Sequence, residues 1–426
     1  MRKLIYLPAI LVVLLAVLWS CNKEKDTYTY DVYSPNYMEF DEFRAAFASA
    51  PPKRIKQSGK IYFKDDYIFI NEVNEGLHII DNRNPVDPVK IAFYKIPGNV
   101  DMAIRGNTLF VDSYIDLVAI DISNIHNPSE IARLENAFPE VLPIAIDQNI
   151  PMAWQEIDRS KGVIVGWQRK TVTEEAYYHH GGFWKWRSRA EFTTTDAGGA
   201  NNSAGVAGSM ARFMLHEQFL YAITKPWMLK TIDISSPSAM NISDSIPTWR
   251  EMETLFRLNQ HLFVGTTTGM VIYDLENPSK PQLVSEFNHA NACDPVVVEN
   301  DIAYVTLRTG NACFGATNQL DVIDIADIRN PKLLKSYPFF NPHGLGIDKG
   351  ILFICDGADG LKVYDATNPL AILSNQIAHF KNIDTYDVIP LGQILILIGQ
   401  DGLFQYNYAD VQNMELLSHI KLSNEL

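Results

Sequence analysis

The sequence predicts an all-β protein, a seven-bladed β-propeller, and three observations lead to this fold. A short strand ending in an acidic residue or its amide recurs along the chain. The copies stand about forty residues apart, with one larger gap. Gly, Pro and Asn mark turns between the strand-like segments of each copy. A period near forty with several short strands per unit is typical of propeller blades.

The recurring segment is clearest at residues 360–369, where a glycine precedes an alternating strand that ends in Asp365 and a turn closes with Asn-Pro. The final residues of successive copies are separated by 40, 112, 41, 50, 41 and 42 positions. Alternation with period 2 places one face of each strand against a neighbouring blade. We expect the terminal aspartate to form an Asx turn, so we interpret it as structural. The copies are LHIID (77–81), LVAID (117–121), LKTID (229–233), MVIYD (270–274), LDVID (320–324), LKVYD (361–365) and LFQYN (403–407).

These pentapeptides resemble LVIVD repeats, and the resemblance covers roughly residues 56–424. Thr231 breaks the apolar pattern of the third copy, and Asn407 replaces aspartate in the last. The resemblance implies a propeller of a bacterial cell surface. Many members of this family are lipoproteins, and most have no assigned activity.

Residues 1–20 have the features of a lipoprotein signal peptide. Arg2 and Lys3 precede an apolar run that ends at Leu18, which is too short to span a bilayer comfortably. The sequence Leu-Trp-Ser-Cys at 18–21 resembles a lipobox, which implies lipidation of Cys21, and Asn22 implies delivery to the outer membrane. We therefore expect a lipid-anchored protein at the outer membrane or cell surface of a Gram-negative bacterium. An ordinary signal peptide with a chance cysteine is the alternative.

The rest of the chain divides into a tether and one large domain. Residues 21–55 are expected to form a lipid-anchored tether and a short helical lead-in, because 40–43 and 45–50 have helix-favouring composition before Pro51. Residues 56–426 are expected to form the propeller domain, with an insertion at about 140–210. The insertion is long enough for an eighth blade or for an excursion.

Within the insertion, residues 162–168 are expected to form an added edge strand of the second blade. Residues 197–209 are rich in Gly, Ala, Asn and Ser and are expected to be flexible. Each blade should have four strands, and in the sixth these are predicted at 344–347, 351–355, 361–364 and 377–380. A strand from one terminus is expected to complete a blade begun by the other, which closes the ring.

The cysteines suggest one disulfide. Cys293 and Cys313 flank the two strands of a hairpin expected to turn at 299–301, and the outer compartment is oxidising. We predict that they are bonded, which stabilises the fold by about 3 kcal/mol for a loop of roughly twenty residues. Cys355 lies on an apolar strand and is expected to be a free, buried thiol.

The insertion also carries a candidate binding surface. Tyr177, Tyr178, Trp184 and Trp186 lie within ten residues beside the expected flexible run. They are candidates for an aromatic platform that stacks on sugar rings or on a partner protein. Alternatively, they fold back and cap the propeller.

A second candidate site lies at one mouth of the central channel, where the inner strands begin. Three carboxylates and a histidine converging there could hold a cation such as calcium or an oxygen-rich ligand. The two basic residues of the set favour a salt-bridged, water-filled mouth instead. The residues expected at this mouth are Lys60, Asp101, Arg212, Thr254, Asp294, His343 and Asp387.

The functional prediction is a non-catalytic binding or scaffold propeller. A formal net charge of −14 argues against nucleic acid as a partner and against flat binding to an anionic membrane. No nucleophile elbow, zinc-protease motif or phosphate loop is present in the sequence. We expect a monomer that binds a glycan or a protein. The alternative is a glycan hydrolase or lyase with Asp101, Asp294, Asp387 and His343 as acid/base residues.

Overall fold

The computed structural model describes residues 27–139, 141–143, 145, 147, 149–175, 206–288, 295–309 and 317–422. The chain forms two compact units. The first comprises residues 1–36, 145–158 and 166–189, and the second comprises 37–144, 159–165 and 190–426. Among the described residues, no helix has the length and apolar character needed to cross a membrane.

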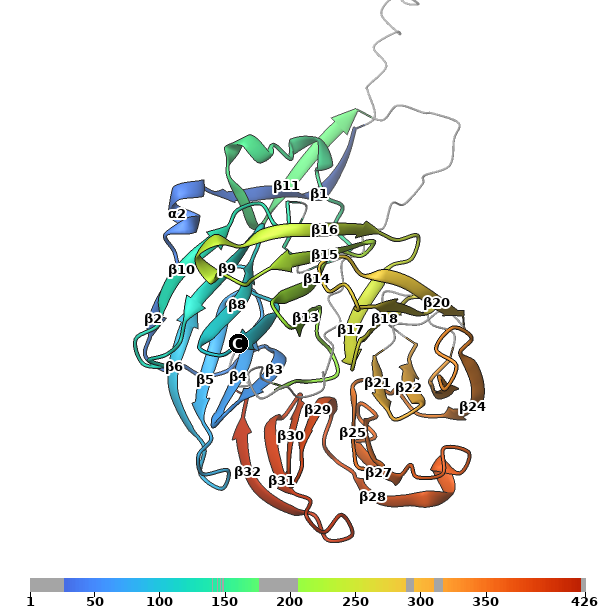
Figure 1. The fold of residues 1–426 in the computed structure, drawn as a ribbon. Coiled ribbons are helices and arrows are strands. Elements are labelled where there is room, and N and C mark those ends of the chain that lie inside the picture. Colours follow the sequence, from blue (N-terminus) through green and yellow to red (C-terminus); the bar gives the residue numbers. More distant parts are fainter. Residues whose placement is uncertain are drawn as a thin grey trace, which may run out of the picture. The chain divides into compact units, whose positions relative to one another are not determined.

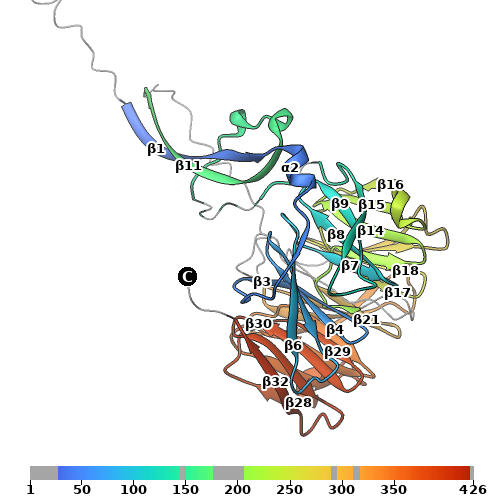
Figure 2. The same cartoon turned by 90° about the vertical axis from the view of Figure 1, so that its left-hand side faces the viewer.

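The second unit is a seven-bladed β-propeller, in which seven antiparallel sheets are arranged around a central axis (Figure 1; side view in Figure 2). Blades 2 to 7 each have four consecutive strands, and blade 1 has six in the order β12-β3-β4-β5-β6-β2. The strands of blades 1 to 3 are β2 Ala48–Ala50, β3 Ser58–Lys64, β4 Tyr67–Glu72, β5 Gly76–Asp81, β6 Val89–Lys95, β7 Met102–Arg105, β8 Thr108–Ser113, β9 Asp116–Asp121, β10 Ser129–Leu134, β12 Val206–Ala207, β13 Phe213–His216, β14 Phe219–Lys225, β15 Met228–Asp233 and β16 Asn241–Pro247.

The remaining blades follow the same plan, and the four strands of the sixth lie within one residue of the predicted ranges. The strands of blades 4 to 7 are β17 Met252–Leu258, β18 His261–Thr266, β19 Gly269–Asp274, β20 Gln282–Asn288, β21 Val296–Glu299, β22 Ile302–Leu307, β23 Gln319–Asp324, β24 Lys332–Pro338, β25 Leu345–Asp348, β26 Ile351–Cys355, β27 Leu361–Asp365, β28 Gln376–Phe380, β29 Thr385–Leu391, β30 Ile394–Gly399, β31 Gly402–Asn407 and β32 Glu415–Lys421. Short 3-10 helices lie at η1 Trp154–Glu156, η2 Arg159–Lys161, η3 Pro237–Ala239 and η4 Ile372–Asn375.

The recurring aspartate is structural, as the sequence predicts. In all seven copies a side-chain oxygen accepts the backbone N–H of the residue two positions later, at 2.6–3.1 Å. This Asx turn ends the third strand of each blade and starts the turn toward the outer strand. The seven residues are Asp81, Asp121, Asp233, Asp274, Asp324, Asp365 and Asn407.

The glycine that opens the repeat is required by close backbone approach. At Gly76 φ is +139°, and at Gly360 it is +89°. A Cβ on either residue would lie 1.9 Å from a carbonyl oxygen of the outer strand, Tyr94 O or Phe380 O. Glycine is therefore required here, because any side chain would clash with the outer strand where it runs beside the start of the third strand.

Blades 7 and 1 close the ring through an apolar interface. Side chains of blade 1, including Ile61 and Ile70, pack in one cluster with Ile389 and Ile396 of blade 7. Gln405 on β31 donates a hydrogen bond of 2.7 Å to a side-chain oxygen just after β5. The expected terminal strand exchange is wrong, because each blade has four consecutive strands of its own. Packing of adjacent blades joins the ends of the ring.

The insertion does not add a strand to blade 2. β11 (Val163–Glu175) pairs with β1 (Thr27–Met38) in a separate two-stranded sheet, so the expected edge strand at 162–168 is wrong. In the first unit, Asp31 accepts hydrogen bonds from Arg169 Nε at 3.0 Å and from Thr171 at 2.7 Å. These contacts fix the pairing of strands that lie far apart in sequence. In the described part of the chain, seven blades are present and the insertion forms no eighth.

The lead-in is less helical than its composition indicates. Residues 27–38 form strand β1, helix α2 spans only Phe40–Arg44, and Ala48–Ala50 form strand β2 on the edge of β6. Phe43 is fully buried among Tyr114, Ile115 and Val163 of the second unit. Pairing with β6 outweighs the helix preference of the alanines, because intrinsic propensity is routinely overridden by tertiary contacts.

Candidate functional site

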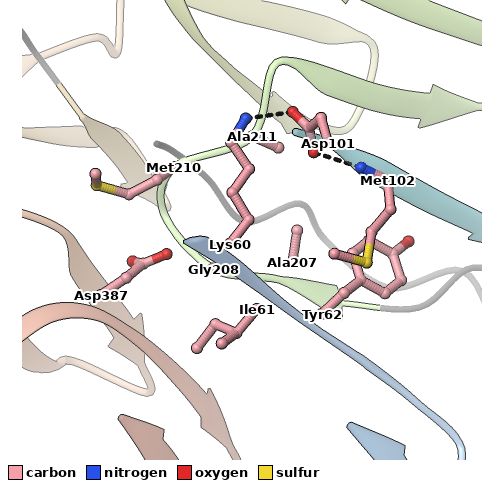
Figure 3. A pocket seen from close by; sticks show the side chains of 10 residues that line it. All are labelled: Lys60, Ile61, Tyr62, Asp101, Met102, Ala207, Gly208, Met210, Ala211 and Asp387. Carbon is pink, nitrogen blue, oxygen red and sulfur yellow. Dashed lines mark hydrogen bonds and ion pairs between the residues drawn. The ribbon is translucent and has the colours of Figure 1, made fainter. Parts of the chain in front are cut away.

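The channel mouth brings together three of the predicted residues. Lys60 lies on β3, Asp101 directly precedes β7, and Asp387 lies on β29, so each stands near the start of an inner strand. All three are buried. Figure 3 shows Lys60 paired with Asp101, and Asp387 on the other side of the same hollow, whose lining also includes Met210 and Ala211.

Asp101 is fully engaged by neighbouring groups. Its Oδ2 forms an ion pair with Lys60 Nζ and accepts the backbone N–H of Arg212 at 2.5 Å, while Oδ1 accepts the N–H of Met102 at 2.7 Å. The adjacent Asp112 accepts the backbone N–H of Asp101 at 2.8 Å. The carboxylate of Asp101 thus connects blade 1 to blade 2 and to the entry of blade 3.

Asp387 is held in a similar way at the opposite end of the chain. Its Oδ1 accepts the N–H and the hydroxyl of Ser209, at 2.9 and 3.0 Å, and the N–H of Val388 at 2.9 Å. The hydroxyl of Ser209 in turn accepts the N–H of Leu345 on β25 at 2.7 Å. A buried serine therefore links blade 6 to blade 7.

A single stretch of chain, residues 206–212, occupies the mouth, and we name it the channel segment. Its first part, β12, pairs with β3. The N–H of Gly208 then donates to Ile61 O on β3 at 3.2 Å. Further along, Ala211 O accepts the N–H of Leu255 on β17 at 3.0 Å. Together with its bonds to Asp101, Asp387 and Leu345, the channel segment contacts five blades before it enters β13 of blade 3.

The hollow beside the channel segment is salt-bridged, as the alternative interpretation of the sequence proposed, because Lys60 pairs with Asp101. It is too narrow to admit a water-sized sphere. The expected flexibility of 197–209 is wrong for the last four residues, because Val206–Ala207 pair with β3 and Ser209 is completely buried. Residues 197–205 lie outside the described residues.

Burial shifts the pKa values of the charged groups in this mouth. It raises the pKa of Asp387 to about 7 and that of Asp112 to about 6, because the ionised carboxylates are removed from water. Burial also lowers the pKa of Lys60 and of Arg212, although the nearby carboxylate of Asp101 opposes both shifts. Asp387 is thus close to half-protonated at neutral pH, within an enclosed site.

The other described members of the set, Arg212, Thr254 and His343, do not line this hollow. The ring of His343 lies against Tyr386, with 5.6 Å between centroids, and its Nε2 is 3.2 Å from Asn341 Nδ2. Burial, together with the nearby charge of Arg308, lowers the pKa of His343 to about 3, so its ring is neutral at physiological pH. The hydroxyl of Thr254 accepts a backbone N–H on β18 at 3.2 Å.

Several predicted residues fall outside the part of the chain that the structure describes. These are Cys21, Tyr177, Tyr178, Trp184, Trp186, Cys293, Asp294 and Cys313. Cys355 is a free, buried thiol, as expected. Within the described ranges, no three His, Cys, Asp or Glu side chains are grouped so that they could hold a metal ion.

Three exposed aromatic residues of the second unit were missed by the sequence reasoning. Trp227, Trp249 and Phe340 are 49%, 102% and 60% exposed. Trp227 follows Pro226 directly, and each of the other two stands two residues after a proline that ends an outer strand. An aromatic residue in a turn just after proline is a signal that could have identified them.

The family comparison agrees with this architecture. The model of the LVIVD repeat matches residues 57–95, 98–135, 208–248 and 260–289. These matches lie in the first four blades. No curated protein matches the chain.

Solved structures with similar folds have very low sequence identity. The computationally designed Ika8 protein is 9% identical, with a TM-score of 0.51 over 87% of this chain and 91% of that one. The WD40 domain of Pan2 from Neurospora crassa is 10% identical, with a TM-score of 0.51 over 80% and 86%. BamB from Moraxella catarrhalis is 10% identical, with a TM-score of 0.48 over 92% of each chain. Likeness at this level concerns the fold alone. The chain is thus a seven-bladed β-propeller that carries LVIVD repeats.

Proposed function

We propose that this propeller is a non-catalytic binding or scaffold protein, anchored by lipid at Cys21 to the outer membrane or cell surface, with a glycan or a protein as its ligand. The observation that carries the proposal is the state of the channel mouth. Asp101 and Asp387, the described carboxylates expected there, are both used within the fold. The chain itself fills the place where a propeller enzyme would take its substrate.

A propeller enzyme is the alternative, and the pKa of Asp387 near 7 is the observation that favours it, since general acids and bases work best near the ambient pH. The acid/base set would be Asp101, Asp387 and His343 with Asp294. Against this alternative, the hollow beside Asp387 has no room for a water-sized sphere. A substrate would reach Asp387 only after the channel segment had moved.

Binding and turnover measured together test the proposal. The full-length chain, purified in detergent, is incubated with neutral hexasaccharides of glucose, xylose, mannose and N-acetylglucosamine and with glycopeptides. Bound ligand is measured by calorimetry and products by chromatography. The proposal predicts saturable binding with every ligand recovered intact. Product formation that is lost in Asp387→Asn would establish the enzyme instead.

The anchor has its own test. Cys21→Ser should abolish incorporation of radiolabelled palmitate and move the protein out of the outer-membrane fraction, because the acyl chains supply the apolar surface that holds it there. Cys355→Ser is the control, since that thiol is buried in the propeller. Unchanged labelling of Cys21→Ser would exclude the lipid anchor at this residue.

A further inference from the structure

Two tryptophans lie on adjoining turns at the junction of blades 3 and 4. Trp249 is fully exposed in the loop that leads from β16 to β17, and Trp227 is half exposed in the turn between β14 and β15. The turns are joined by two backbone hydrogen bonds. One runs from Thr248 N–H to Trp227 O at 2.9 Å, and the other from Met252 N–H to Pro226 O.

These turns are braced before any ligand arrives. The hydroxyl of Thr248 donates to Arg250 O at 2.7 Å, which holds the loop that carries Trp249. The guanidinium of Arg250 donates to Thr268 Oγ1 and to Glu286 Oε2, each at 2.8 Å. Rigid turns reduce the conformational entropy lost on binding, so exposed indoles placed on them are suited to recognition.

The charges around the indoles are balanced. The charged residues within two positions of either tryptophan are Lys225, Arg250 and Glu251, and Arg250 pairs with Glu286, so these four formal charges sum to zero in a chain whose net charge is −14. A neutral surface neither attracts nor repels a charged ligand over a distance. The guanidinium and carboxylate of the Arg250–Glu286 pair still have donor and acceptor capacity beyond the bond that joins them. The surface thus combines flat apolar rings with neutral polar edges.

The exposed area suits a small ring better than a protein. An indole side chain buries at most about 250 Å², so the two rings together offer on the order of 400 Å². A stable protein interface needs about 800 Å² from each partner. A sugar ring has one apolar face of C–H groups and a rim of hydroxyl groups, which matches indole rings bordered by Arg250 and Glu286.

We propose that Trp227 and Trp249 form a binding site for a neutral saccharide, in which a sugar ring stacks on indole and its hydroxyl groups bond to Arg250 and Glu286. This site rests on the proposed binding function and gives it a ligand class. It is separate from the channel mouth and from the aromatic residues predicted at 177–186.

The test measures binding of the four neutral hexasaccharides to the full-length chain by calorimetry and tryptophan fluorescence. Trp249→Ala should weaken binding about tenfold or more, which corresponds to about 1.4 kcal/mol, and Trp249→Phe should restore part of the affinity. Trp227→Ala should weaken binding as well. Trp154→Ala is the matched control, because Trp154 is also 49% exposed but lies in the first unit. Each variant is checked for an unchanged melting temperature.

Three outcomes separate this site from the general function. Binding that is equal in wild type, Trp227→Ala and Trp249→Ala would overturn the site while the binding function stands. Failure of all four hexasaccharides to bind would overturn the saccharide class, and glycopeptide binding would then keep the wider function. Cleavage of a bound hexasaccharide would overturn the non-catalytic function. Even in that case, loss of hexasaccharide binding in Trp249→Ala would support the proposed site.

Discussion

Asp387 is a buried carboxylate whose charge should make the stability of the propeller depend on pH. Its pKa is 3.8 in the unfolded chain and about 7 in the folded protein, because burial penalises the ionised form. The folded state therefore binds the proton more tightly. The contribution of Asp387 to the free energy of unfolding is greatest below pH 4, falls as the pH rises from about 4 to about 7, and is constant above that.

Asp387→Asn should remove this dependence. Three pKa units at about 1.4 kcal/mol each give a change of about 4 kcal/mol between pH 4 and pH 7. Asparagine keeps an oxygen that can accept the bonds from Ser209 and Val388, which all go to a single oxygen in the wild type. Relative to wild type, the variant should therefore become progressively more stable between pH 4 and pH 7.

The assay is chemical denaturation of both proteins at half-unit steps from pH 4 to pH 8. Titrations shared by the two proteins cancel in the difference of their unfolding free energies. Asp365→Asn is the control, since hydrogen bonds from Thr367 lower the pKa of Asp365 below its unfolded value of 3.8, so its difference from wild type should stay nearly constant above about pH 5. A difference between Asp387→Asn and wild type that does not vary with pH would refute the reasoning.

Three further predictions concern the framework of the propeller. Ile396→Ala should lower the free energy of unfolding by about 2–5 kcal/mol, because it opens a cavity in the interface that closes the ring. Gly360→Ala should cost about 3 kcal/mol or more, since its Cβ would lie 1.9 Å from Phe380 O at a positive φ. Reduction of the predicted disulfide between Cys293 and Cys313 should cost about 3 kcal/mol, and peptide mapping without reductant should recover the linked peptides.

Matched controls accompany these variants. Leu416→Ala removes an exposed side chain on an outer strand and should change stability by less than about 0.5 kcal/mol. Gly106→Ala places a Cβ in open space at a φ of +55°, so it should cost only about 1 kcal/mol. Equal costs for Gly360→Ala and Gly106→Ala would contradict the close approach of the outer strand. Free thiols at both Cys293 and Cys313 would exclude the disulfide.

Most of the fold could be predicted from the repeat, because its turns form through contacts between residues that are close in sequence. A strand that ends in aspartate makes its own Asx turn, and Asp365 does so with Thr367 only two residues away. The positive φ of Lys349 and Gly350 likewise produces the hairpin turn between the strands predicted at 344–347 and 351–355. Such features depend on neighbours in sequence, so the seven repeated blades could be predicted, whereas the sequence left open whether the insertion forms an eighth.

Long-range pairing could not be predicted in the same way. β11 pairs with β1, and the alternation of polar and apolar residues in either strand does not reveal its partner. The low-complexity composition before Ser209 suggested a flexible run, whereas acceptors supplied by inner strands of other blades fix its end. Asp101 and Asp387 were expected near one mouth, but the channel segment that uses their carboxylates could not be inferred.

The occupied channel mouth is the central claim of this account, and hydrogen–deuterium exchange of the channel segment tests it most directly. The amides of Gly208, Ser209 and Arg212 all donate to acceptors on inner strands or next to them. In the full-length protein at neutral pH, the amides of a peptide covering residues 206–212 should therefore exchange as slowly as those of a peptide from β29. Exchange as fast as that of an unstructured peptide would contradict the account and would leave the mouth open for a ligand.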